Sequence, residues 1–145
     1  MSYETELNDL LEDIYRNVRV MEEQDLKKSR LNLSISEMHL LEQIGKEEGG
    51  MTVSEIALRQ NVTKPSVTVA VNKLVQKGYC EKQHVESDGR SVLVTLTRLG
   101  RRVNALHARF HRSMIREVTQ DLTETEKEKL MEIMGRLNRY FESRL

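Results

Sequence analysis

The chain has 145 residues with 23 Lys or Arg against 23 Asp or Glu, and this length suits one domain with a real hydrophobic core. It contains no apolar run of the ~18 residues that a membrane span requires, and its acidic start lacks the basic and apolar regions of a secretion signal, so we expect no membrane contact and a cytoplasmic location. A single cysteine, Cys80, excludes an internal disulfide and a CxxC motif.

The zero net charge conceals an uneven distribution. Residues 1–58 carry 6 basic and 13 acidic side chains, whereas residues 59–102 carry 9 basic and 3 acidic ones. Such a basic segment is either a solvated face or the electrostatic footprint of a protein that binds phosphates, nucleic acid above all. Charge alone does not separate these two interpretations.

The first 30 residues predict one long helix. Over residues 5–30, apolar side chains recur at spacings of four, three, four and three, which places them in one stripe. These side chains are Leu7, Leu11, Ile14, Val18 and Met21. So narrow a stripe resembles a packing seam.

Two shorter helices are marked by capping boxes, in which a hydroxyl accepts a backbone N–H and the glutamate three residues later reaches back. The boxes are Ser34 to Glu37 and Thr52 to Glu55, and Asn61 is the expected end of the second helix. The inward residues are Met38, Leu41 and Ile44 in the first helix and Val53, Ile56 and Ala57 in the second.

A third helix is expected from Lys64 to Lys77. Thr63 can cap it, and Pro65 sits in its first turn, where the missing N–H costs nothing. The buried side comprises Val67, Val71, Leu74 and Val75, while Lys64, Thr68 and Asn72 recur every four residues on another side.

Residues 79–85 and 92–97 are alternating or β-branched runs joined by a polar tip, which predicts a hairpin. Two helices follow, the last of them opened by a third capping box from Thr123 to Glu126. Their apolar stripes are Leu99, Val103, Leu106, Phe110 and Met114, then Leu130, Met134, Leu137 and Phe141. The predicted fold is therefore mainly α-helical with a small β-hairpin wing.

Two capped helices joined by a turn and followed by a hairpin describe a winged helix-turn-helix over residues 34–97. The second of these helices suits a DNA major groove of about 12 Å, with its N-terminal N–H groups directed at phosphates. An ordinary polar helix face would explain any one of its exposed residues, but the whole set favours DNA. The candidate DNA-binding residues here are Ser54, Lys64, Pro65, Ser66, Thr68, Val69, Asn72 and Lys73.

The hairpin tip supplies two more candidates, Asp88 and Arg90. Gly89 between them permits a tight turn, from which an arginine can enter a narrow minor groove. A carboxylate would meet phosphates there, so Asp88 is interpreted as a residue that orients the turn or a nearby arginine. Good turn chemistry is the alternative explanation of this tripeptide.

The run from Asp88 to Arg90, followed by Val94-Thr-Leu-Thr97, resembles the Asp-x-Arg wing signature of the MarR family of transcriptional regulators. The resemblance covers nearly the whole chain. It implies a homodimer whose first and last helices interlock, here residues 1–33 and 98–145, and two winged lobes that read a pseudo-palindromic double-stranded operator. The apolar seams fit such a dimer. The whole chain, 1–145, would then be one MarR-type domain.

Four segments, LKKSR (26–30), EMH (37–39), IGK (44–46) and LHARFH (106–111), resemble the branch that represses fatty-acid biosynthesis genes in Gram-positive bacteria. That resemblance implies a long-chain acyl group on acyl carrier protein as corepressor, with no other cofactor required. Candidates to line an acyl pocket are Ile14, Val18, Met38, Leu41, Phe110 and Met114, although each could be a plain core residue. Lys27, Lys28 and Arg30 could meet the acidic carrier protein.

Two alternatives stay open. His107 and His111 share a helix face, and His39 could approach them with Glu22 or Glu23. Together they would make a zinc site of the kind that a zinc-responsive branch of the family uses. A hydrogen-bonded structural pair of histidines is the default interpretation. A helical protein-interaction module without DNA binding is the other. No catalytic arrangement of residues is present, so an enzyme is not expected. Cys80 is interpreted as a buried, inert thiol.

Overall fold

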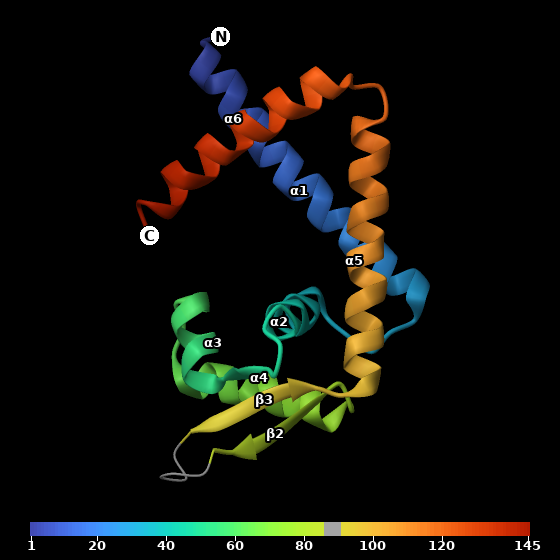
Figure 1. Cartoon of the computed structure of the whole chain (residues 1–145), viewed down its shortest axis with the longest axis vertical. Coiled ribbons are helices and arrows are strands. Elements are labelled where there is room, and N and C mark those ends of the chain that lie inside the picture. The colour runs from blue at the N-terminus through green and yellow to red at the C-terminus, as the bar shows by residue number, and fades with distance from the viewer. Residues whose placement is uncertain (86–90) are drawn as a thin grey trace. The chain divides into compact units, whose positions relative to one another are not determined.

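The computed structural model describes residues 1–85 and 91–145, so that the predicted wing-tip residues Asp88 and Arg90 lie outside the described part of the chain. Over the described residues the chain forms six helices and three short strands (Figure 1). In chain order these are α1 (Tyr3–Ser29), α2 (Ile35–Gly45), β1 (Met51–Thr52), α3 (Val53–Gln60), α4 (Lys64–Gln76), β2 (Cys80–His84), β3 (Val92–Leu96), α5 (Arg98–Thr119) and α6 (Glu124–Glu142). The mainly helical fold with a small sheet confirms the predicted fold class.

The chain divides into two compact units, Met1–His107 and Ala108–Leu145, with α5 crossing the boundary. The first unit contains α1 to α4, the three strands and the start of α5. The second unit contains the remainder of α5 together with all of α6. The assignment of residues 1–145 to one domain stays a prediction. None of the helices, over the residues that the structure describes, is long and apolar enough to cross a membrane.

All three predicted capping boxes are present. At the start of α2 the Glu37 backbone N–H donates to Ser34 Oγ at 3.1 Å, and the Ser34 N–H donates to Glu37 Oε1 at 3.0 Å. Thr52 with Glu55 and Thr123 with Glu126 repeat the pattern at α3 and α6. Each box satisfies backbone donors that a helix leaves without intrahelical partners, so the serine or threonine determines where the helix begins.

The hairpin strands β2 and β3 pair antiparallel, with His84 opposite Val92, and β1 pairs with the other side of β3 to give the order β1-β3-β2. The strand β1 was not predicted, because a two-residue strand carries no periodicity. Gly50 explains how β1 approaches: its φ is 90°, and a Cβ there would lie 2.2 Å from the Val94 carbonyl oxygen. Only glycine allows the backbones to come this close.

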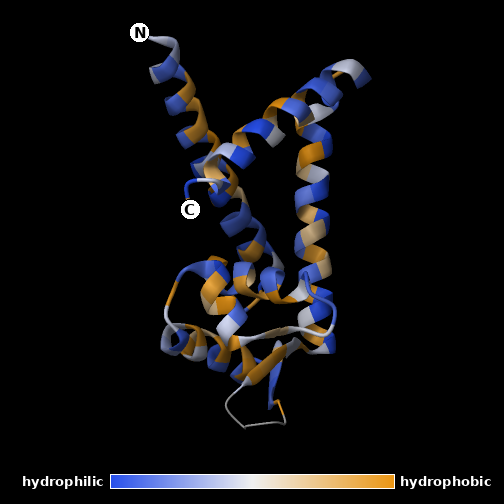
Figure 2. Ribbon diagram, turned by 60° about the vertical axis from the view of Figure 1, so that its left-hand side comes forward, coloured by the Kyte–Doolittle hydropathy of each residue, from blue (hydrophilic) through white to orange (hydrophobic). Residues whose placement is uncertain are grey.

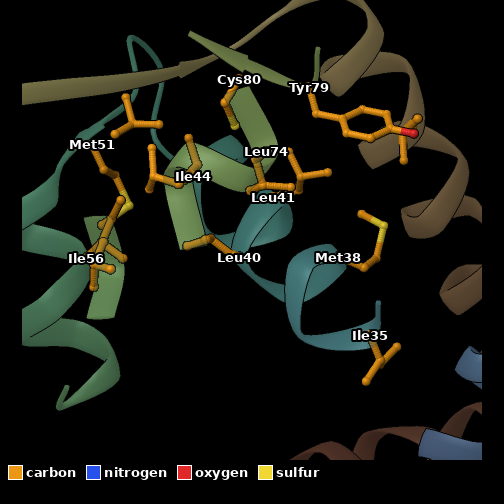
Figure 3. Packing of buried hydrophobic residues seen from close by; sticks show 14 of the residues in the cluster. Ile35, Met38, Leu40, Leu41, Ile44, Met51, Ile56, Leu74, Tyr79 and Cys80 are labelled. Atoms are coloured by element: carbon orange, nitrogen blue, oxygen red, sulfur yellow. The ribbon is translucent and has the colours of Figure 1, made fainter. Parts of the chain in front are cut away.

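The first unit has one hydrophobic core, assembled mainly from α2, α3, α4 and the sheet, with Leu26 of α1 and Val103 of α5 added to it (Figure 3). The inward residues predicted for α2 and α4 belong to it, except Val75, which is half-buried against it. Met38, Leu41 and Leu74 have no exposed surface, and Ile44 and Val71 are 1% exposed. Each such side chain contributes roughly 1.5–3 kcal/mol by leaving water. Burial of one side of α4 in this core leaves its other side toward solvent.

Polar contacts fix the C-terminal end of α4 in place. At its C-terminal end, Lys77 Nζ donates to both carboxylate oxygens of Glu37 on α2, at 2.8 and 3.0 Å. Beyond it, Thr97 Oγ1 donates to the Gly78 carbonyl oxygen at 2.6 Å and accepts from the Gly100 N–H at 3.1 Å, which joins the end of α4 to the start of α5. These contacts restrict the orientation of α4 relative to α2.

We predict that Lys77→Met destabilises the fold by about 1–3 kcal/mol, since it removes two charged hydrogen bonds from a carboxylate only 13% exposed. Burial acts to raise the pKa of Glu37, but the Lys77 and Ser34 hydrogen bonds outweigh it and hold the pKa below its ordinary value of 4.5. Because the pKa of Glu37 is lower in the folded protein than in the unfolded chain, this stabilisation is complete above the ordinary value of 4.5. It is lost as the pH falls through the folded pKa. Urea unfolding of both proteins at pH 7 and pH 3 should show the difference shrinking in acid. A difference independent of pH would contradict the assignment.

Candidate nucleic-acid interface

The outer face of α4, defined as Lys64, Pro65, Ser66, Thr68, Val69, Asn72 and Lys73, is exposed throughout. Every residue predicted to contact DNA from this helix therefore lies where a partner could reach it. Val69 is 58% exposed. The methyl groups of Val69 and Thr68 give this face apolar contact points among its polar ones, as thymine methyl groups require.

The start of α4 differs from the starts of the other capped helices. Thr63 caps it by accepting the Ser66 N–H at 3.3 Å, but the position that holds glutamate in α2, α3 and α6 holds Ser66 here, and the first turn has no acidic residue. A glutamate there would partly neutralise the positive end of the helix dipole and repel phosphates. Its replacement by serine leaves that end suited to an anion.

Several polar side chains of this face have local hydrogen bonds that orient them. Thr68 Oγ1 donates to the Lys64 carbonyl oxygen at 3.0 Å, and Thr63 Oγ1 and Ser66 Oγ lie 2.8 Å apart. Asn72 Oδ1 accepts a hydrogen bond from Lys82 Nζ of β2. Lys82 was not predicted as part of the site. The alternation of β2 could have placed it beside α4, but its partner could not be chosen from sequence.

The remaining predicted DNA-binding residues lie elsewhere. Ser54 is exposed near the start of α3, whereas Asp88 and Arg90 are outside the described residues. The two strands of the hairpin remain hydrogen-bonded as far as the last described residues on each side. There the Val85 N–H donates to the Ser91 carbonyl oxygen at 2.8 Å. The turn between α3 and α4 is closed by Asn61 in the left-handed conformation, φ 53°, as its predicted role as helix end requires.

The residues predicted to line an acyl pocket fall into different environments. Met38 and Leu41 lie in the core of the first unit with no exposed surface, whereas Ile14 on α1 is 58% exposed and Val18 is half-buried. Phe110 and Met114 lie in the second unit and are partly exposed. Their role as a pocket stays a prediction.

Two of the three histidines of the proposed zinc site meet a buried carboxylate. Glu22 of α1, 5% exposed, has Oε2 at 3.0 Å from His39 Nε2 and Oε1 at 3.5 Å from His107 Nε2. Glu42 Oε2, which was not predicted as a neighbour, lies 3.4 Å from the same His107 nitrogen. His111 is one helical turn beyond His107 on α5. Imidazole nitrogens and carboxylate oxygens are ligands that zinc accepts.

Cys80 is buried at the start of β2, 2% exposed, as expected from the sequence. Burial raises the pKa of its thiol to about 12, so the reactive thiolate is scarce at neutral pH. The inert-thiol interpretation fits this environment.

The whole architecture recurs in solved structures. FabT of Streptococcus pneumoniae, solved in complex with DNA, is 34% identical to this chain, with a TM-score of 0.90 over 97% of this chain and 99% of that one. MepR of S. aureus, also solved with DNA, has a TM-score of 0.75 at 20% identity over 99% of this chain and 100% of that one, a likeness of fold alone.

Sequence comparison leads to the same class of protein. The model of the MarR family matches residues 31–91, the stretch from just before α2 into the wing. TcaR of Staphylococcus aureus, an HTH-type transcriptional regulator, is 26% identical over 88% of this chain and 86% of its own length. YhjH of Bacillus subtilis, an uncharacterised HTH-type regulator, is 29% identical over 57% of this chain, and the chain spans about half the length of such relatives. These relatives are transcriptional regulators rather than enzymes.

Proposed function

This chain belongs to the MarR family of transcriptional regulators, and from that premise we propose that it is a homodimeric repressor that binds a pseudo-palindromic DNA operator. The observation that carries the proposal is the outer face of α4: exposed, basic, free of acid in its first turn and fixed by a buried core. In the proposed complex this face enters the major groove, and Arg90 at the wing enters the flanking minor groove.

The proposed dimer is supported by apolar side chains that the isolated chain leaves in water. On α6, Met134 is 50% and Phe141 53% exposed, and on α1, Ile14 is 58% and Leu10 57% exposed. Figure 2 shows apolar residues recurring among polar ones along both helices. Amphipathic helices of this kind usually bury their apolar side against another helix. A second copy of the chain would supply it.

We further propose fatty-acid biosynthesis genes as the target and long-chain acyl groups on acyl carrier protein as the corepressor. The 34% identity to FabT over nearly the whole chain supports this assignment. The burial of Met38 and Leu41 gives it a physical consequence, since an acyl chain among these residues must displace side chains from the core that also holds α4. An acyl chain bound there would thereby change the packing that holds the outer face of α4 in position.

A second candidate effector is zinc, favoured by the carboxylate of Glu22 between two imidazoles. Glu22, His39 and His107 would provide ligands from α1, α2 and α5, and His111 is the predicted fourth. Zinc in this place would join three helices of the fold and could change the affinity for DNA in the same way. The two effectors predict different experimental outcomes.

We predict that two chains bind one palindromic promoter duplex and that the affinity falls steeply with salt. Each phosphate neutralised by a Lys or Arg releases counterions, so log K should fall linearly with log salt concentration, with a slope of about −0.9 per contact. Fluorescence anisotropy at several salt concentrations, with sedimentation of the free and bound protein, measures both quantities. A slope near zero would rule out DNA binding and favour the alternative of a protein-interaction module. A protein that sediments as a monomer at micromolar concentration would rule out the proposed homodimer.

We predict that acyl carrier protein bearing a long acyl chain tightens operator binding about 5–150-fold, the usual range of coupling between two sites. Carrier protein without an acyl chain should have no effect. The same titration with zinc and with a chelator tests the alternative. His39→Gln is the matched control, since it removes a zinc ligand without entering the apolar core. Tightening by zinc that this variant abolishes, with no response to the acylated carrier, would replace the first effector by the second.

A further inference from the structure

One hydrogen bond joins the wing to the outer face of α4. Lys82 Nζ, on β2, donates to Asn72 Oδ1, on α4. Both side chains are exposed, and Asn72 stands one turn after Thr68 on the face proposed to read DNA. The contact therefore lies within the proposed interface rather than behind it.

The fold explains why Lys82, among the residues of β2, reaches α4. Lys82 pairs with Val94 across the sheet, and paired residues of antiparallel strands project from the same side. Val94 has no exposed surface, so that side is the one that covers the core and its helices. Cys80, two residues before Lys82, is buried on the same side by the alternation of the strand. Lys82 thus extends toward α4 from β2, which is an edge strand of the sheet.

The chemistry of this pair determines how the Asn72 amide is turned. A lysine ammonium has three donors and no acceptor, so it can contact only the carbonyl oxygen of a carboxamide and never its NH₂ group. With Oδ1 held toward β2, Nδ2 and its two hydrogens are directed away from Lys82. The neighbouring charge makes this orientation stronger than a neutral hydrogen bond would.

We propose that Lys82 is a positioning residue that makes Asn72 read base edges mainly as a hydrogen-bond donor. A free asparagine recognises adenine by donating to N7 and accepting from the N6 amino group. In the oriented amide the Lys82 ammonium occupies one of the two lone pairs of Oδ1, so an adenine amino group on the other lone pair would lie beside that positive charge, which weakens the adenine pairing. Nδ2 can donate to guanine O6 and N7, to thymine O4 and to adenine N7, but guanine alone offers two neighbouring acceptors, and adenine N7 lies beside the disfavoured amino group. This inference rests on the proposed function and specifies its sequence preference.

The test is a binding profile over operators in which each base pair of one half-site is replaced in turn. Asn72→Ala locates the position that Asn72 reads, as the one where discrimination is lost. Lys82→Met keeps the aliphatic stem and removes the donor. At that position it should reduce the preference for guanine or thymine over adenine by about tenfold, with other positions unchanged. The double variant should lose no more discrimination there than Asn72→Ala alone, because Lys82 acts through Asn72.

Two lysine variants serve as controls for charge. Lys64→Met, on α4 itself, should weaken binding to all sequences by a similar factor and lower the salt slope by about one contact, as loss of a phosphate contact does. Lys46→Met, at the end of α2, should leave affinity and preference unchanged. Circular dichroism of each variant checks that the fold is intact.

Two results would overturn the inference. In the first, Lys82→Met behaves like Lys64→Met, with uniform weakening and unchanged preference, and Lys82 is then a phosphate contact. In the second, the wild-type protein prefers adenine at the position that Asn72 reads. A wild-type protein that binds every sequence equally would instead remove the proposed function, so the two failures are distinguishable.

Discussion

The burial of one side of α4 in the core of the first unit is the constraint on which the rest depends. Val67, Val71 and Leu74 are withdrawn from water together with the inward residues of α2. A 13-residue helix with two lysines in its exposed face gains little stability alone, and its direction is determined by what it packs against. Once the apolar side is fixed, the opposite side must face solvent, and its residues are the proposed DNA contacts.

Polar contacts complete this support at three points. The bidentate ion pair between Lys77 and Glu37 ties the end of α4 to the start of α2. Thr97 joins that end to α5, and Lys82 ties the middle of the helix to β2. An effector that enters the core at Met38 or Leu41 would act on the same supports, which connects the proposed corepressor to DNA affinity without any contact to DNA itself.

Much of the fold could be predicted from the sequence because the signals are local. The capping boxes at Ser34, Thr52 and Thr123 fix three helix starts, and the spacing of Val67, Val71 and Leu74 identifies the buried side of α4. What was missed depends on residues far apart in the chain. The strand β1 exists through its pairing with β3, and the partners of Lys77, Lys82 and His107 are 40, 10 and at least 65 positions away. Periodicity cannot choose such partners.

The central claim is that the outer face of α4 contacts DNA, and thiol protection tests it most directly. Cys80 is buried with a raised thiol pKa, so an introduced exposed cysteine reacts against a quiet background. Thr68→Cys should react readily with a maleimide in the free protein and slowly once operator DNA is bound, while Lys46→Cys reacts equally in both. Equal reactivity of the cysteine at position 68 with and without bound operator would contradict the account.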